Sequence, residues 1–241
     1  MTSSASSVGS VAAAREAARY GADVIVAQGA DAGGHQFARA AGVVSLVPEI
    51  VDMLREEEFD GGGVERGEGQ EEGEGEGKKR KKKRDIAVWA AGGIADGRGV
   101  AAALALGAEG VVLGTRYMVA TESDAQDFKR KALLSTSDGG QNTVKSQLHD
   151  HVQGNTAWPD IYDGRAVVHP SYQDHLAGVP LEENERRFKA AKERGDSSRG
   201  VTWSGTGVGL VKKEQPAAEI TREVRDGALR VLSGLKVDAK L

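Results

Sequence analysis

A histidine that follows two glycines is the first candidate for chemistry in this chain. His35 comes directly after Gly33 and Gly34, so backbone without side chains can lie close to a ligand beside the imidazole ring. An imidazole with an ordinary pKa of about 6.5 can take a proton from a weak carbon acid near neutral pH. The spacing alone leaves two interpretations open: a catalytic base, or a loop histidine that hydrogen-bonds its own turn.

Two more glycine-containing turns have the pattern of a phosphate site. Gly92 and Gly93 follow one apolar segment, and Gly114 and Thr115 follow the next. Turns of this kind expose backbone N–H groups beside helix N-termini, where a phosphate binds readily. Two such turns on consecutive strands favour a phosphate site over glycines that only form tight turns.

Short apolar runs and alanine-rich segments must position these residues. We expect buried strands at residues 23–27, 85–91 and 109–113, and helices at 11–20, 48–58 and 98–106. Strand, glycine turn and helix therefore alternate, which is the pattern of parallel βα units with right-handed crossovers. In such units ligands bind at the carboxyl ends of the strands, where all three glycine turns are expected.

Composition excludes several kinds of protein. The 241 residues include 33 glycines and no cysteine, which rules out disulfides and thiolate chemistry. A net charge of −4 argues against a general nucleic-acid binder, and no apolar run approaches the roughly 18 residues of a membrane span. The first seven residues lack the apolar core of a secretory signal.

A charged, glycine-rich stretch interrupts the pattern. Residues 55–84 contain ten acidic side chains and end in the basic run 78–84. With almost no apolar residues, this stretch cannot bury enough surface to offset its ordering entropy, so we predict a disordered insert. The basic run has the composition of a nuclear-localisation signal, but a solvated loop is favoured because glutamates lie beside it.

Two weaker motifs lie in the second half of the chain. His149 and His151 flank Asp150, but no third ligand is nearby, so we predict no metal site. The run 205–209 (Gly-Thr-Gly-Val-Gly) is similar to a nucleotide-binding glycine motif, but no predicted strand precedes it. Helices are expected at 124–135, 181–194 and 219–232.

Four motifs in order carry a family resemblance. They are 21–29 (GADVIVAQG), 31–35 (DAGGH), 90–99 (AAGGIADGRG) and 113–116 (LGTR). Together they closely resemble the nitronate monooxygenase family, formerly called 2-nitropropane dioxygenase. Later segments, including Trp158-Pro159 and 162–165 (YDGR), are similar to the fungal branch.

The resemblance implies an FMN-dependent TIM-barrel enzyme that uses O2 to oxidise alkyl nitronates or nitroalkanes to carbonyl compounds and nitrite. It implies that His35 is the catalytic residue, which removes the α-proton of a nitroalkane or steers an anionic nitronate. The expected cofactor-binding residues are Gln28, Gly33, Gly34, Gly92, Gly93, Val112, Leu113, Gly114 and Thr115. The expected partners are a small-molecule nitronate or nitroalkane and O2. The resemblance implies no metal, nucleic-acid or membrane partner. The expected location is the cytoplasm.

The expected fold class is α/β, as a partial TIM (β/α)8 barrel with a C-terminal helical extension. Residues 1–120 would supply the last three βα units, and residues 121–241 would form the extension packed on the barrel. Upstream of the first clear strand we expect only a remnant of another, near residues 7–11.

Two alternatives stay open on sequence grounds. One is an FMN-dependent NAD(P)H:quinone or enoyl reductase of the same barrel type. The other is a non-catalytic truncated fragment, because three parallel strands leave an unpaired edge and no opposite wall.

Overall fold

The structure is a computed structural model that describes residues 3–59 and 84–235. Most of the predicted disordered insert at 55–84, with the basic run up to residue 83, lies outside the described residues. Both ends of that stretch belong to the fold. Phe59 is buried in the core, and the Arg84 guanidinium pairs with the Asp23 carboxylate at 2.9 Å. The predicted boundaries are therefore too wide at both ends.

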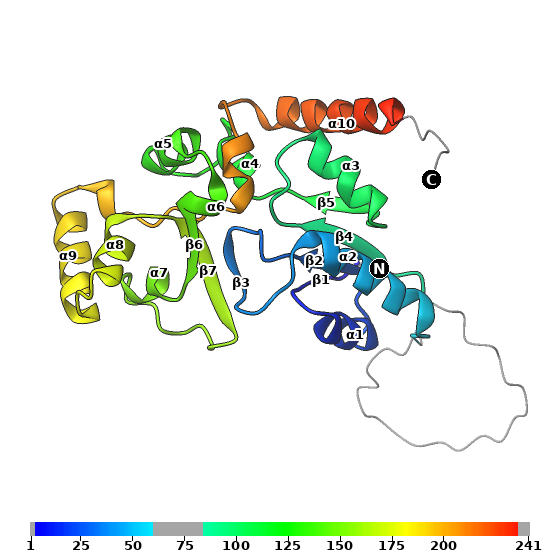
Figure 1. Ribbon diagram of the computed structural model, residues 1–241, viewed down its shortest axis with the longest axis horizontal. Helices are drawn as coiled ribbons and strands as arrows, with labels where there is room; N and C mark the ends of the chain where they lie inside the picture. The colour runs from blue at the N-terminus through cyan, green and yellow to red at the C-terminus, as the bar shows by residue number, and fades with distance from the viewer. Residues whose placement is uncertain (1–2, 60–83, 236–241) are drawn as a thin grey trace, which may run out of the picture.

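Four parallel strands form the central sheet, in the order β1-β2-β4-β5 (Figure 1). They are β1 (Ala5–Val8), β2 (Val24–Gln28), β4 (Ala87–Ala91) and β5 (Gly110–Val112). The last three confirm the predicted parallel strands. The first is a correction, because β1 pairs along its full length with β2, with Ser7 opposite Val26, instead of being a remnant. Because serine has no strong preference for strands, the extended backbone of β1 depends on its pairing with β2.

Three helices cover one face of this sheet: α1 (Val11–Arg19), α2 (Val43–Glu56) and α3 (Gly97–Ala105). The largest fully buried side chains between the layers are Ile25 of β2 and Leu46 and Ile50 of α2, all 2% exposed or less. Helix α2 begins five residues earlier than predicted, so Pro48 lies inside it and not in its first turn. The apolar residues before Pro48 extend the helix because they pack on the sheet.

The other face of the sheet is only partly covered. Side chains alternate along a strand, so Trp89 of β4 and Val112 of β5 point away from the three helices. Each is 39% exposed.

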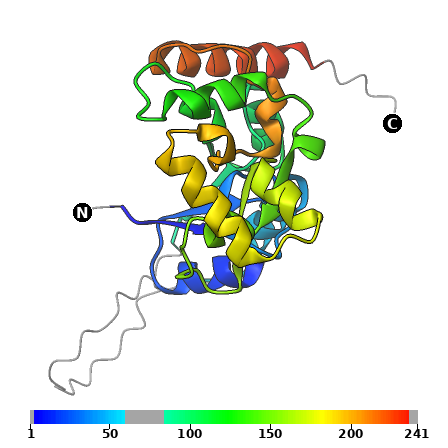
Figure 2. The ribbon, with the colours of Figure 1, turned by 90° about the vertical axis from the view of Figure 1, so that its left-hand side faces the viewer.

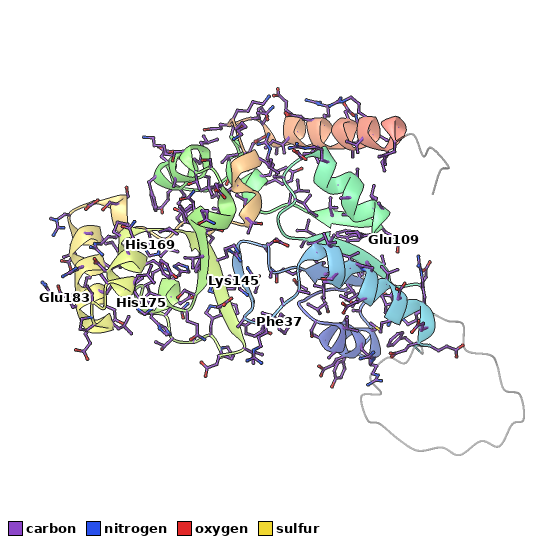
Figure 3. All side chains as sticks on the ribbon, in the orientation of Figure 1. Phe37, Glu109, Lys145, His169, His175 and Glu183 are labelled. Atoms are coloured by element: carbon purple, nitrogen blue, oxygen red, sulfur yellow. The ribbon has the colours of Figure 1, made fainter. Side chains whose placement is uncertain are left out.

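A second, antiparallel sheet was not expected. It has the order β3-β7-β6, with β3 (Gly34–Phe37), β6 (Thr143–Ser146) and β7 (Tyr162–Val167). The sequence predicts a loop at His35 and a helical extension beyond residue 121, whereas both contribute strands. The three strands are short, and β3 pairs with β7 across more than a hundred residues of sequence, so no local pattern reveals the sheet. Lys145 of β6 reaches the Phe37 carbonyl of β3 at 2.8 Å (Figure 3).

Helices beyond residue 114 surround this second sheet and the edge of the first. They are α4 (Thr115–Met118), α5 (Asp127–Ser135), α6 (Gly139–Asn142), α7 (Leu148–His151), α8 (Pro170–Leu176), α9 (Leu181–Glu193) and α10 (Ala217–Gly234), with short 3-10 helices at Ser197–Arg199 and Thr206–Leu210. Figure 2 shows α8 and α9 together on the side of the molecule away from the central sheet. Helix α10 packs along α3, where a Cβ on Gly97 would collide with the backbone of Gly227. The predicted helices at 11–20, 98–106, 124–135, 181–194 and 219–232 are confirmed, within a few residues at each end.

Candidate functional site

A cavity of about 190 Å³ opens at the carboxyl ends of the parallel strands. The turns after β2, β4 and β5 supply three of its walls, as expected for a parallel sheet. Eight of the nine predicted cofactor-binding residues line it: Gln28, Gly33, Gly34, Gly92, Gly93, Val112, Gly114 and Thr115. Leu113 does not, because its side chain packs against the core beneath α3 and α10.

Several residues that line this cavity have backbone N–H groups without a partner in the described part of the chain. The N–H groups of Gly93, Ile94, Gly114 and Thr115 donate no hydrogen bond to the described part of the chain. Gly92 and Gly93 have φ values of 114° and 69°, a region that glycine occupies without strain, and this turns the backbone after β4. These residues line the cavity, so it offers several hydrogen-bond donors to an anion.

The first turn of α3 does not offer free donors, because its own N-cap residue uses them. The Asp96 carboxylate caps it and accepts from the Arg98 and Gly99 N–H groups at 2.9 and 3.4 Å. The free donors come from the turn that precedes the helix.

The fourth wall comes from the glycine run near the end of the chain. Gly205 and Gly207 line the cavity, and the Gly205 N–H donates to the Thr115 hydroxyl at 2.9 Å. A Cβ on Gly207 would collide with the Gly93 carbonyl, so two backbones touch there directly. From sequence alone the run is discounted as a nucleotide-binding motif because no predicted strand precedes it, although its glycine and threonine residues could approach a ligand. The better signal was that this run is a fourth glycine turn, similar to the three at the strand ends.

Helix α6 supports this wall from behind. A Cβ on Gly139 would collide with the Thr206 carbonyl, whereas one on the adjacent Gly140 would meet only the end of a side chain at 3.7 Å. We therefore expect Gly139→Ala to lower the free energy of unfolding by about 1–3 kcal/mol, and Gly140→Ala to leave it nearly unchanged. Urea unfolding of both variants tests this. Equal effects of the two changes would contradict the close approach of Gly139 to the wall.

His35 lies beside the cavity, on β3, in contact with two tryptophan rings. Its ring stacks on Trp158 with a centroid distance of 4.0 Å and an interplanar angle of 16°. The centroid of the Trp203 ring lies 4.9 Å from that of His35, with the two planes tilted by 53°. His35 itself is not among the lining residues, but Trp203 is, so Trp203 connects the histidine to the cavity.

Two residues hold this arrangement. Gly164 of β7 lies opposite His35 in the second sheet, and any side chain there would collide with the Trp203 ring. Gln28, at the end of β2, donates to the His35 carbonyl at 3.2 Å and so ties the two sheets together.

His35 has a buried acidic partner that the sequence did not identify. Both carboxylate oxygens of Asp150 lie within 3.0 Å of His35 Nε2. Asp150 is 5% exposed, and the side chain of His35 is 24% exposed. The pair is separated by 115 residues of sequence.

The neighbouring His149 belongs to a buried histidine pair. Its Nδ1 lies 3.0 Å from Nε2 of His169, and its own Nε2 lies 3.0 Å from the Val144 carbonyl. Burial lowers the pKa of His149 and lowers that of His169 to about 4, so both rings are neutral at pH 7. A neutral His149 donates from Nε2 to the carbonyl, and His169 donates to its Nδ1. Figure 3 labels His169 in the lobe formed by α7, α8 and α9.

Within residues 3–59 and 84–235, no three His, Cys, Asp or Glu side chains come together as metal ligands. No helix in that part of the chain is long and apolar enough to cross a membrane.

A parallel α/β sheet with a donor-rich cavity at the carboxyl ends of its strands defines a ligand-binding protein of the α/β class. Comparison with known proteins identifies the family. The family model described as nitronate monooxygenase matches residues 2–226. The chain belongs to the nitronate monooxygenase family.

Relatives from two fungi carry the same name. A nitronate monooxygenase of Neurospora crassa is 56% identical over 221 residues, which are 92% of this chain and 52% of that protein. The nitronate monooxygenase npaC of Metarhizium robertsii is 36% identical over 95% of this chain and 58% of that protein. The chain thus spans little more than half the length of these relatives.

Solved structures agree on the fold. FabK from Thermotoga maritima has a TM-score of 0.68 and 26% identity, and the match covers 96% of this chain and 62% of that one. The nitroalkane oxidase of Streptomyces ansochromogenes has a TM-score of 0.69 and 23% identity, and the match covers 98% of this chain and 60% of that one. At 23% identity the second likeness concerns the fold alone.

Proposed function

We propose that this chain carries the phosphate site and the catalytic histidine of an FMN-dependent nitronate monooxygenase. The observation that carries the proposal is a set of N–H groups after β4 and β5 that have no partner among the described residues and belong to residues lining one cavity. A phosphate accepts several such bonds, and a cradle of glycines lets it approach the backbone. A Cβ on Gly114 would meet nothing within 4 Å, so the cavity has room there for a phosphate-bearing group.

Each residue is assigned to a part of the proposed cofactor according to its place in the cavity. Gly92, Gly93, Gly114 and Thr115 would hold the phosphate, and Gln28, Gly33, Gly34 and Val112 would lie along the rest of the cofactor. The volume of about 190 Å³ is smaller than the roughly 300 Å³ or more of a pocket that encloses a whole ligand. The described residues would therefore enclose part of the cofactor, in keeping with our proposal that the sheet belongs to a partial (β/α)8 barrel.

The proposed reaction converts a nitronate or nitroalkane and O2 into a carbonyl compound and nitrite. FMN, when bound, would supply the electron-accepting group. His35 would remove the α-proton of a neutral nitroalkane, or orient an anionic nitronate that has already lost it. The two tryptophans in contact with the ring would limit its movement and its contact with water.

A flavin titration followed by anaerobic mixing tests the proposal. We expect the purified protein to change the absorbance spectrum of added FMN, and propyl-2-nitronate to bleach the bound flavin in the absence of O2. An FMN spectrum that stays unchanged would remove the enzyme function and support a non-catalytic fragment. Rapid bleaching by a nicotinamide cofactor, but not by the nitronate, would support a quinone or enoyl reductase.

A further inference from the structure

The carboxylate of Asp150 has one cationic or titratable partner among the described residues, and that partner is His35. Its two oxygens lie 3.0 and 2.9 Å from His35 Nε2, and its other side-chain contact is the Asn155 amide, which donates at 3.3 Å. A buried carboxylate with no Arg or Lys partner is costly unless a group with a proton stands beside it.

This contact fixes which nitrogen of His35 carries the proton. A carboxylate only accepts hydrogen bonds when ionised, so Nε2 must be the N–H donor of the neutral ring. His35 Nδ1 is then the nitrogen with a free lone pair, and it has no hydrogen-bond partner in the described part of the chain. The ring therefore has one nitrogen committed to Asp150 and one free to accept a proton.

The protein holds Asp150 rigidly. The short helix α7 that carries it begins after Ser146, whose hydroxyl accepts from the Leu148 N–H at 3.1 Å. The adjacent His149 is bonded to the Val144 carbonyl of β6 and to His169, at 3.0 Å each. Because His149 is fully buried in this network, the position of the next residue is determined by the second sheet.

We propose that Asp150 is the positioning residue of His35: it holds the ring as the Nε2–H tautomer, leaves Nδ1 as the base, and stabilises the imidazolium that forms when Nδ1 takes a proton. The inference rests on the proposed function. The proton balance is simple, since the α-carbon of the nitroalkane loses a proton, Nδ1 gains it, and Asp150 stays ionised. Stacking on Trp158 adds to the stabilisation, because a cation is attracted to an indole face.

Other charged groups around His35 are arranged differently. Those on the elements packed against it are His149, Asp150 and His151 of α7, Asp160 of the following loop, and Asp163 and Arg165 of β7. Asp163 forms an ion pair with Lys145 at 3.3 Å, and Arg165 donates to the Ala30 carbonyl. Asp150 is the member of this set that is bonded to the histidine.

Two variants and two readouts test the proposal. Asp150→Asn keeps the size and an acceptor oxygen but removes the charge, and Asp150→Leu removes the hydrogen bond as well. NMR of ¹⁵N-histidine-labelled protein, without flavin, should show His35 as the Nε2–H tautomer in the parent and a mixture of tautomers in Asp150→Leu. Asp124→Asn, an exposed carboxylate elsewhere, is the matched control.

Activity supplies the second readout. For Asp150→Asn we expect kcat/KM on nitroethane to fall about 10- to 100-fold, a part of what a positioned general base contributes. Oxidation of propyl-2-nitronate should change less than about twofold, because its proton is already lost. The acidic limb of the pH–rate profile on nitroethane should move to lower pH, since the carboxylate no longer favours the protonated ring.

The outcomes separate the two proposals. A parent His35 in the Nδ1–H tautomer would overturn the role of Asp150, whatever the activity. Equal losses on both substrates with an unmoved acidic limb would also overturn it and indicate a structural role. If the parent turns over neither substrate, the proposed function fails, while the tautomer measurement still decides whether Asp150 positions the ring.

Discussion

Replacing His35 with alanine should reduce kcat/KM on nitroethane by about 10²–10⁴-fold, the range that a positioned general base contributes. The physical reason is that the α-proton of a neutral nitroalkane then has no acceptor beside the cavity. Propyl-2-nitronate has no proton to lose, so its oxidation should fall much less, by the part that His35 contributes to orientation. Steady-state oxygen consumption with both substrates over the same pH range measures the difference.

The matched control is His175→Ala. His175 is exposed on α8, and Figure 3 labels it in the lobe away from the central sheet. This change should leave both rates unaltered, and FMN binding should be the same in all three proteins. Equal rates of the parent and His35→Ala on nitroethane would refute the role of base.

Acidification should destabilise the folded protein through His169. Burial lowers the pKa of its ring from 6.5 to about 4, and the nearby rings and charges of His149 and Arg199 act in the same direction. Between these two values the unfolded chain binds the proton more readily than the folded one, so stability is complete above pH 6.5 and falls as pH decreases toward 4. The shift corresponds to about 3 kcal/mol in total, of which about 2 kcal/mol is lost by pH 5.

The change His169→Gln isolates this contribution. A glutamine amide can replace the donor that His169 offers to Nδ1 of His149, but it does not titrate. Urea unfolding at pH 7.5 and pH 5 should show a smaller loss of stability in His169→Gln than in the parent, by about 2 kcal/mol. The same pH dependence in both proteins would show that His169 is not buried as a neutral ring.

Local sequence patterns were sufficient to predict the parallel part of the fold. Residues 23–27, 85–91 and 109–113 are short, mainly apolar runs, each followed within two residues by glycine, and such runs are typical of buried parallel strands. The same glycines pointed to the edge where the cavity lies. The extent of strand β1 was underestimated because serine residues do not indicate a strand. Pairing with β2 holds this segment in its extended conformation.

The surroundings of His35 could not be predicted in this way. Asp150, Trp158 and Trp203 come to the histidine from segments more than a hundred residues away, through a sheet of three short strands. Strands of that kind are stabilised by their partners, so their pattern is visible only when the partners are known. On sequence grounds His149 and His151 are considered as metal ligands and rejected, whereas the residue that contacts His35 is the aspartate between them.

The wall formed by Gly205 and Gly207 has a consequence for biosynthesis. The strand-end donors of Gly93 and Gly114 leave the ribosome before the segment that forms the fourth wall, because Gly205 lies ninety residues after Thr115. A nascent chain that has not reached Gly205 has the donors and no fourth wall. The proposed cofactor site is therefore complete only after the segment with Gly205 and Gly207 has been translated and has docked onto the strand ends.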